Sequence, residues 1–289
     1  MNILITGATG FLGSHIVKRL ISENHQVVCL KRKTSDMKRI IPIKHKIKLY
    51  NLEDVILEKV FVENDIDAVI HTATNYATTE LSIIDTIQAN LALPIELILL
   101  AKNNNCKFFI NTDTILDKRV SHYSLSKKQF IDWFKLYSKD ITCLNIQLEH
   151  FYGPSDNQNK FTTFIIHQLI HNVPKIDLTF GEQKRDFIFI DDVVSAFIFV
   201  INNYKNFQFS FKNFEVGTNN PISIKEFVLL AKKICNNHKT FLNFGALDYR
   251  ENEPMVSSPN TSDLRELGWE PKVFLKEGLE KTIHFEKGK

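Results

Sequence analysis

The chain opens with a glycine-rich turn between an apolar run and a helical pattern, and this turn restricts the possible folds more than any other feature. Asn2–Thr6 has the character of a buried strand, and Phe11–Glu23 has that of a helix. The glycines between them are Gly7, Gly10 and Gly13. Glycines at such a turn let the backbone approach a pyrophosphate closely, and the anion then lies at the positive end of the helix. A second apolar strand follows at Gln26–Leu30, so the order of elements favours a dinucleotide site over a simple tight turn.

Strand and helix patterns go on alternating beyond this turn, which is typical of βαβ units around a parallel sheet. The predicted strands are Asn2–Thr6, Gln26–Leu30, Ile47–Tyr50, Ala68–Thr72, Lys107–Asn111 and Thr142–Leu148. The predicted helices between them are Phe11–Glu23, Leu52–Asn64, Leu81–Asn103 and Tyr123–Ser138. These strands and crossovers predict an α/β fold with a doubly wound parallel sheet of the Rossmann type. Pro94 cannot donate to the carbonyl of Asn90, so we expect a kink in the third helix.

After Phe151 the pattern becomes irregular and indicates a smaller second lobe. Its predicted elements are helices near Phe161–Asn172, Val193–Asn203, Lys225–Asn236 and Leu275–Phe285, and a strand near Phe187–Ile190. We therefore expect a dinucleotide-binding domain over residues 1–150, with later segments packing back on it. Residues 151–289 would mainly form a substrate-binding lobe.

Composition narrows the classes of partner. Lys plus Arg is 36 against 33 for Asp plus Glu, a net charge of +3 without a dense basic stripe, so nucleic acid is not the expected partner. The four cysteines, Cys29, Cys106, Cys143 and Cys235, lie far apart, which supports neither a metal site nor a disulfide framework. The N-terminus lacks the pattern of a signal peptide, and no run approaches the roughly 18 apolar residues of a membrane span. A cytoplasmic protein without membrane contact is the expectation.

The end of the second strand bears on the choice of cofactor. It reads Leu30-Lys31-Arg32-Lys33, where an NAD-binding unit usually offers an acidic residue to the adenosine ribose. Lys31 and Arg32 would instead neutralise the 2′-phosphate of NADPH, and Arg32 is favoured because its planar guanidinium suits phosphate oxygens. The alternative is a solvated basic turn.

Tyr123 and Lys127 form a candidate acid/base pair. Their spacing places phenol and ammonium on one face of a helix, where the cation would lower the pKa of Tyr123 and make proton transfer feasible. Taken alone, such a pair is more often ordinary helix surface. It gains weight because Asn111–Thr114 precedes it at the carboxyl end of a strand, where ligands bind in such sheets.

Together, the glycine spacing, Thr112 and the Tyr123/Lys127 pair resemble the extended short-chain dehydrogenase/reductase family, of the NAD-dependent epimerase/dehydratase type. Further segments that resemble the family are Asp67–Ala73, Asn90, Tyr152–Pro154, Arg185–Asp192 and Leu267–Pro271. The resemblance covers nearly the whole chain.

This resemblance implies roles for individual residues. Thr112 would hydrogen-bond the substrate oxygen, Tyr123 would act as acid/base, and Lys127 would orient the nicotinamide ribose and tune Tyr123. The implied NADP(H) contacts are Gly7, Gly10, Phe11, Leu12, Gly13, Lys31, Arg32, Asn51, Leu52, Thr72, Ala73, Asn90, Tyr123 and Lys127. Arg185 and Arg250 would hold the diphosphate of a nucleotide-sugar substrate, with ordinary surface charge as the alternative. A homodimer is also implied, through the helices after the third and fourth strands.

Departures from the family pattern concern the reaction. Family dehydratases carry Thr-Asp-Glu where this chain has Thr112-Asp113-Thr114, so the base that they need is absent and dehydration is disfavoured. The missing ribose-binding acid favours NADPH that arrives reduced and leaves oxidised. Gln147 stands where an arginine is common, and the segment between Thr114 and Tyr123 is short.

The run Leu148–Asp156, with Gln183–Ile188, is similar to bacterial nucleotide-sugar 4-ketoreductases. The expected reaction is NADPH-dependent reduction of the C4 ketone of a CDP- or dTDP-linked 4-keto-6-deoxyhexose or 3,6-dideoxyhexose, within deoxysugar and surface polysaccharide synthesis. The alternatives are a C4 epimerase with tightly bound NAD and a non-catalytic NADP(H) sensor. Such sensors usually lose the catalytic residues, which are present here.

Overall fold

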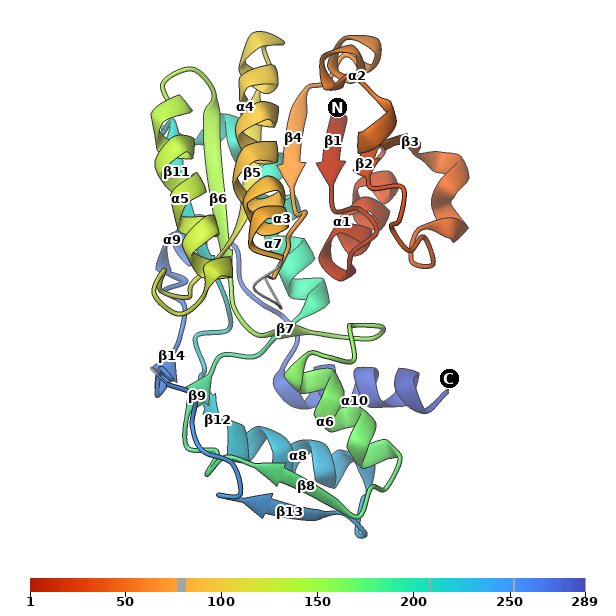
Figure 1. Ribbon diagram of the computed structural model, residues 1–289, viewed down its shortest axis with the longest axis vertical. Coiled ribbons are helices and arrows are strands. Elements are labelled where there is room, and N and C mark those ends of the chain that lie inside the picture. Colours follow the sequence, from red (N-terminus) through yellow and green to blue (C-terminus); the bar gives the residue numbers. More distant parts are fainter. Residues whose placement is uncertain (77–81, 208, 252, 289) are drawn as a thin grey trace. The chain divides into compact units, whose positions relative to one another are not determined.

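Figure 1 shows the chain as a computed structural model, which describes residues 1–76, 82–207, 209–251 and 253–288. The chain divides into two units. Unit 1 consists of Met1–Leu148 and Val194–Glu215, and unit 2 of Glu149–Val193 and Val216–Lys289.

Unit 1 is built on a seven-stranded sheet. Its strands are β1 (Asn2–Thr6), β2 (Gln26–Lys31), β3 (Lys48–Asn51), β4 (Ala68–His71), β5 (Phe108–Thr114), β6 (Thr142–Leu148) and β11 (Phe211–Val216). The order is β11-β6-β5-β4-β1-β2-β3, and the pairings from β3 to β6 are parallel. The predicted doubly wound α/β sheet is thereby confirmed. The sequence missed β11, an edge strand in which only Phe214 and Val216 are buried and no clear alternation marks a core face.

Helices cover the sheet of unit 1. They are α1 (Phe11–Ser22), α2 (Leu57–Asn64), α3 (Ile83–Ile87), the π-helical turn η4 (Gln88–Ala92), α4 (Leu93–Asn103), α5 (His122–Tyr137) and α7 (Ile190–Asn203), which enters unit 1 at Val194. Short 3₁₀ turns are η1 (Ile41–Lys46), η2 (Leu52–Asp54) and η5 (Tyr204–Asn206). The predicted start of the third helix, Leu81, lies outside the described residues.

The irregularity expected at Pro94 lies before the proline. Pro94 occupies the first turn of α4, where its missing N–H costs no helical bond, and η4 immediately precedes it. The π-helical turn therefore replaces the predicted kink within a continuous helix.

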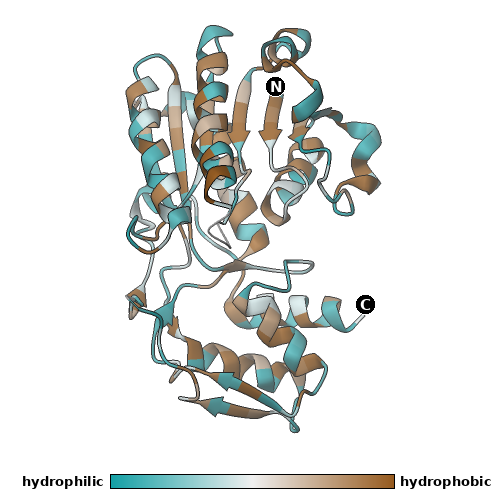
Figure 2. Ribbon diagram, viewed as in Figure 1, coloured by the Kyte–Doolittle hydropathy of each residue, from teal (hydrophilic) through white to brown (hydrophobic). Residues whose placement is uncertain are grey.

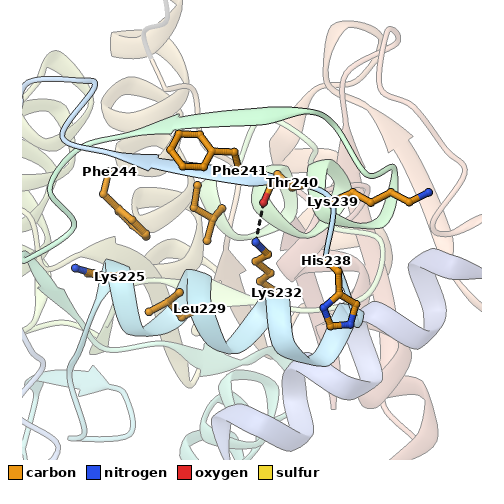
Figure 3. A pocket seen from close by; sticks show the side chains of 9 residues that line it. Lys225, Leu229, Lys232, His238, Lys239, Thr240, Phe241 and Phe244 are labelled. Atoms are coloured by element: carbon orange, nitrogen blue, oxygen red, sulfur yellow. Dashed lines mark hydrogen bonds between the residues drawn. The ribbon is translucent and has the colours of Figure 1, made fainter.

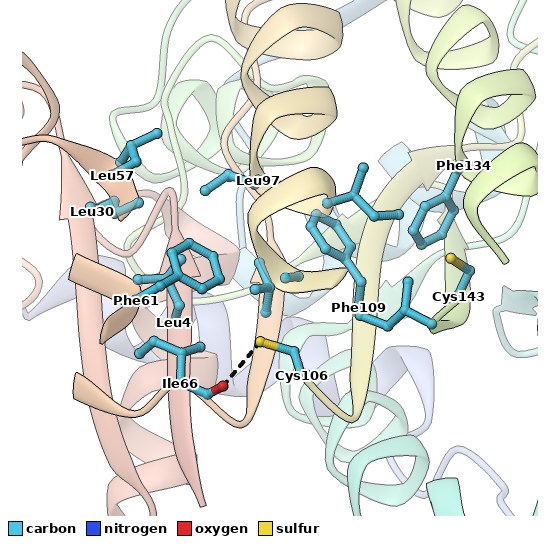
Figure 4. Packing of buried hydrophobic residues seen from close by; sticks show 14 of the residues in the cluster. Leu4, Leu30, Leu57, Phe61, Ile66, Leu97, Cys106, Phe109, Phe134 and Cys143 are labelled. Carbon is cyan, nitrogen blue, oxygen red and sulfur yellow. Dashed lines mark hydrogen bonds between the residues drawn. The ribbon is translucent and has the colours of Figure 1, made fainter. Parts of the chain in front are cut away.

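One face of the sheet carries the core shown in Figure 4, where residues of α2, α4 and α5 pack on alternate strand residues. Phe109 of β5 meets Phe134 of α5 edge-on, with ring centroids 5.4 Å apart. The strands are accordingly brown in Figure 2, and teal gathers on the outer helix faces. All four cysteines are buried and free. Cys106 donates to the carbonyl of Ile66 at 3.0 Å, and burial raises its pKa to about 12, so this thiol is unreactive.

The expectation that no segment is apolar enough to span a membrane does not hold for Ile83–Asn103. By length and composition alone, this helical run is long and apolar enough to cross a membrane. Leu97, Ile98 and Ala101 of this run lie in the core of unit 1, which accounts for part of its apolar character.

Unit 2 has short strands and four helices among its described residues. The strands are β7 (Phe151–Tyr152), β8 (Lys175–Leu178), β9 (Lys184–Arg185), β10 (Ile188–Phe189), β12 (Ile222–Ser223), β13 (Phe241–Phe244) and β14 (Val256–Ser257). The helices are α6 (Phe161–Ile170), α8 (Ile224–Cys235), α9 (Ser262–Glu266) and α10 (Leu275–Lys287). Strands pair as β10-β7, β12-β9-β14 and β13-β8. Ser223 and Glu226 form a capping box that starts α8, and Phe227 of that helix stacks on Phe187 at 4.2 Å.

Candidate active site

The glycine-rich turn of unit 1 has the geometry of a phosphate cradle. Gly7 has a φ of +70°, and a Cβ there would lie 2.6 Å from the nitrogen of Ala73. A Cβ at Gly13 would lie 2.2 Å from the carbonyl oxygen of Gly7. Gly10 caps α1 without a side-chain hydrogen bond, so the positive end of this helix lies at the glycine-rich turn, where an anion is favoured. The turn fits the pyrophosphate of a dinucleotide.

Residues after β4 close one side of this cradle. Thr72 Oγ1 donates to the carbonyl of Thr6 at 2.7 Å, and the nitrogen of Ala73 donates to Thr6 Oγ1 at 3.2 Å. The amide of Asn90 accepts from the nitrogen of Asn75 at 2.9 Å and donates to Ser126 Oγ at 3.0 Å. Asn90 therefore ties the segment after β4 to α5.

The basic residues at the end of β2 are only partly engaged. Lys31 Nζ donates to the carbonyl of Arg32 at 3.2 Å. The Arg32 side chain is exposed and has no ion pair within the part of the chain that the structure describes. Asn51 ends β3 and donates to Asp54 at 2.9 Å, and Leu52 follows it, half-buried against the core.

The structure brings Thr112 and Lys127 together. Lys127 Nζ, buried in α5, donates to the carbonyl oxygen of Thr112 at 2.9 Å. Thr112 lies within β5, and its Oγ1 is buried without a hydrogen-bond partner among the described residues. Tyr123 lies in the first turn of α5, which Ser121 caps, and its ring lies 5.0 Å from that of Tyr76. A buried hydroxyl without a partner is unusual and indicates an oxygen that a ligand would satisfy.

Burial determines the charges at this site. It raises the pKa of Tyr123 above its usual range, Tyr76 and Asp113 add to the rise, and a hydrogen bond with Thr114 opposes it. Burial also lowers the pKa of Lys127 to about 8, against the effect of Asp113. The predicted lowering of the Tyr123 pKa is therefore wrong for this structure, because burial of the phenol raises that pKa.

A buried polar network lies beside these residues, and sequence reasoning missed it. Asp113 Oδ2 accepts from Lys128 at 2.8 Å, from Gln147 at 2.8 Å and from Asn145 at 3.2 Å. Asn213 donates to Gln147 at 2.7 Å. Gln147 thus fills a structural position, and the carboxylate of Asp113 on β5 is engaged by residues of β6 and α5.

In unit 2 the two predicted arginines differ. Arg185, on β9, is 5% exposed, forms an ion pair with Glu253 and donates to the carbonyl of Lys184 at 2.7 Å. Arg250 is exposed. Two aromatic residues that the sequence did not single out also pair in this unit: Phe180, which is 57% exposed, lies 6.3 Å from Tyr249.

Figure 3 shows a hollow of about 580 Å³ in unit 2, between α8 and β13. Lys232 donates there to the carbonyl of Thr240 at 2.7 Å, and Lys225 lies 5.3 Å from the ring centroid of Phe244. None of the residues that line this hollow was predicted as a site residue.

Comparison with known proteins identifies the family. The NAD dependent epimerase/dehydratase family matches residues 3–217, from within β1 to the residue after β11. The chain belongs to this family. It is an enzyme of the extended short-chain dehydrogenase/reductase type, as its motifs predicted.

Relatives and solved structures agree with this assignment. The CDP-abequose synthase of Salmonella muenchen is 34% identical over 97% of this chain and 96% of its own length. The crystal structure of UDP-glucose 4-epimerase from Thermotoga maritima with UDP-glucose has a TM-score of 0.88 at 21% identity, and it covers 100% of this chain and 99% of that one. A UDP-glucuronic acid 4-epimerase from Bacillus cereus, in complex with UDP-glucuronic acid and NAD, has a TM-score of 0.87 at 23% identity, over 100% and 99% of the two chains. At these identities the two structures show a shared fold.

Proposed function

We propose that the protein reduces the C4 ketone of a nucleotide-linked 4-keto-6-deoxyhexose or 3,6-dideoxyhexose with NADPH. The observation that carries this proposal is the buried Thr112 Oγ1 without a partner, beside Lys127 and near the start of the helix that carries Tyr123. A ketone oxygen would satisfy that hydroxyl, and it needs a proton when it becomes an alcohol.

The residues of β5 and α5 would divide the work. Thr112 Oγ1 donates a hydrogen bond to the ketone oxygen and holds it. Tyr123 transfers its phenolic proton to that oxygen, and its high pKa keeps the proton in place until negative charge develops there. Lys127 stabilises the phenolate that remains and positions the cofactor ribose. NADPH, when bound, supplies the hydride to the C4 carbon.

The cofactor preference rests on the end of β2. Arg32 is an exposed cation without an ion pair in the described ranges, and Lys31 is the residue before it. A 2′-phosphate would find two cations there, whereas the ribose hydroxyls of NAD would find no carboxylate in the Lys31–Lys33 segment.

The surroundings of Asp113 argue against dehydration. Its carboxylate is bound by Lys128, Gln147 and Asn145, and the next residue is Thr114. One carboxylate oxygen of Asp113 is thus occupied by a cation and two amides, and Thr114 stands in the dehydratase position instead of a second acid.

A nucleotide-sugar substrate is supported by the relatives named CDP-abequose synthase and by the arginines of unit 2. Arg185 and Arg250 would bind the diphosphate, and the exposed Phe180 with Tyr249 offers a surface for a nucleobase. The same relatives favour CDP as the nucleotide.

The test is to incubate the protein with NADPH and, separately, CDP- and dTDP-linked 4-keto-6-deoxyhexoses and the CDP-linked 4-keto-3,6-dideoxyhexose. NADPH oxidation is followed by absorbance, and the sugar product is identified by NMR. We expect one substrate to give a C4 alcohol with one NADPH consumed for each product. Sugar turnover without net NADPH loss would replace the reductase with a C4 epimerase that holds NAD.

We also propose a homodimer, formed through α3, α4 and α5. Large apolar side chains exposed on these helices are Ile84, Ile87, Leu99, Leu125, Trp133 and Leu136. A second copy would cover this face. The sequence placed the interface on the helices after the third and fourth strands, which include α2. Trp133→Glu should therefore shift the mass measured by light scattering toward the monomer, whereas Val62→Glu on α2 should not.

A further inference from the structure

Glu149 and His150 form a buried polar pair that the proposed reaction does not use. They follow Leu148, the last residue of β6, which lies opposite Thr114 of β5. Chain connectivity therefore places Glu149 one residue beyond the carboxyl end of that strand, the edge where parallel sheets bind their ligands.

The carboxylate of Glu149 lacks the contacts that a buried charge requires. Its side chain is 2% exposed, and neither oxygen has a hydrogen-bond partner among the described residues. Among the described residues it pairs with His150, whose Nδ1 lies 3.3 Å from Oε1. A buried carboxyl group without donors destabilises the fold, and such an exception is a candidate for a functional role.

The His150 ring is held in place from two sides. It forms a T-shaped contact with the ring of Phe187, with centroids 5.7 Å apart, and the backbone oxygen of His150 accepts from the nitrogen of Ile188 at 3.3 Å. Because Nδ1 is turned to Glu149, the other ring nitrogen points away from the carboxylate. The side chain is 33% exposed, and Nε2 has no hydrogen bond within the described ranges.

A carboxylate beside Nδ1 determines what Nε2 offers. The carboxylate can only accept, so it favours a proton on Nδ1, and the neutral imidazole then presents Nε2 as an acceptor. In the structure the contact is within reach of a hydrogen bond but is not aligned as one, which is common before a site binds its ligand. An acceptor nitrogen suits a hydroxyl donor, whereas an ionised diphosphate offers acceptor oxygens alone.

We propose that His150, oriented by Glu149, accepts a hydrogen bond from a hydroxyl of the hexose of the nucleotide sugar. This inference rests on the proposed function. His150 is the sugar-contacting residue, and Glu149 is a positioning residue that acts through it. The pair recognises the hexose, while the arginines of unit 2 are assigned to the diphosphate.

The test measures binding by calorimetry, with three probes: CDP, NADPH, and a CDP-linked 4-keto-6-deoxyhexose without NADPH. His150→Phe keeps the ring packed on Phe187 and removes both nitrogens. It should weaken the sugar nucleotide about tenfold, the effect of one lost hydrogen bond, and leave CDP and NADPH unchanged. A parallel titration with the 3,6-dideoxy sugar locates the hydroxyl, because a smaller loss there assigns it to C3.

Glu149→Leu supplies a readout that a purely structural role would not give. It should raise the melting temperature, because a buried carboxyl group without hydrogen-bond donors is replaced by an apolar side chain, and still weaken the sugar nucleotide. Glu149→Gln should weaken it less. Unchanged sugar-nucleotide affinity in both His150→Phe and Glu149→Leu, or an equal loss of CDP affinity, would overturn the inference. Turnover of the parent protein is measured alongside, so a parent that reduces no nucleotide sugar refutes the proposed function separately.

Discussion

The candidate binding groups of the two units differ in whether they already have a partner. In unit 1, Thr112 on a central strand has a buried hydroxyl without a partner in the described part of the chain. In unit 2, Arg185 on a two-residue strand is already paired with Glu253. The first group gains a contact when an oxygen arrives, whereas the second must exchange one anion for another. Unit 1 is therefore expected to determine turnover, and unit 2 to determine how tightly the substrate is held.

The largest effect is expected when the phenolic hydroxyl of Tyr123 in unit 1 is removed. Tyr123→Phe should lower kcat by about 10²-fold or more, the usual contribution of general acid catalysis. Calorimetry should find NADPH and sugar-nucleotide binding nearly unchanged, because the ring and its contact with Tyr76 remain. Near-parental turnover would remove Tyr123 from the mechanism. It would also contradict the expectation that unit 1 determines turnover.

The buried charge of Lys127, in the same site, affects the stability of the fold. Its folded-state pKa of about 8 lies below the ordinary 10.5, so the folded state binds fewer protons than the unfolded chain between these values. The cost of burying the charge is fully present below about pH 8 and disappears as pH rises toward 10.5. Lys127→Met should therefore unfold at higher urea than the parent at pH 7, an advantage of up to about 3 kcal/mol.

That advantage should shrink as the pH rises through this window. Lys59→Met, on the exposed face of α2, is the matched control. A difference between Lys127→Met and the parent that stays constant from pH 7 to the alkaline end of the window would mean that Lys127 is buried without a shift in charge.

The contrast between the units also explains how far prediction from sequence reached. β6 was predicted with its observed bounds, because Leu144, Ile146 and Leu148 alternate with polar residues, and this period of two needs no information from distant residues. The strands around Arg185 have two residues each, and only pairing with Ile222 and Ser257 makes them strands. No local period can reveal such elements.

The features of the candidate site also divide into those predicted from local spacing and those that depend on distant residues. The spacing of Tyr123 and Lys127 predicted a shared helix face, but the direction of the pKa shift depends on burial and on Tyr76, which lies far away in the sequence. No motif marked Glu253, the partner of Arg185. The family-like run Leu148–Asp156 contains Glu149 and His150 but assigned them no role, because their burial depends on tertiary contacts.

Arg185 tests the unit 2 side, with a smaller expected effect. Arg185→Ala should raise the KM of the sugar nucleotide about tenfold, because a charged contact to the diphosphate is lost, and leave NADPH affinity unchanged. The substitution also leaves Glu253 without its cation. The double variant Arg185→Ala/Glu253→Gln removes that second effect, so a raised KM in both variants assigns the loss to the diphosphate. A change confined to NADPH affinity would overturn the assignment.

The smallest effect is expected at the end of β2 in unit 1, where Arg32 is proposed to favour NADPH over NADH. Arg32 is exposed, and solvent screens its interaction with a 2′-phosphate, so the contact is worth about 1 kcal/mol, or about fivefold in affinity. Arg32→Asp should therefore narrow the preference for NADPH over NADH by at least that factor, since the new carboxylate also repels the 2′-phosphate and can accept from the ribose hydroxyls of NADH.

The measurement is kcat/KM with each cofactor at fixed sugar nucleotide, with Lys18→Asp on the exposed side of α1 as the control for a change in net charge. If the parent uses both cofactors equally, the basic turn is solvated surface and takes no part in cofactor choice. If the preference shifts while the KM of the sugar nucleotide stays constant, Arg32 acts on the cofactor alone, and the assignment of substrate affinity to unit 2 is strengthened.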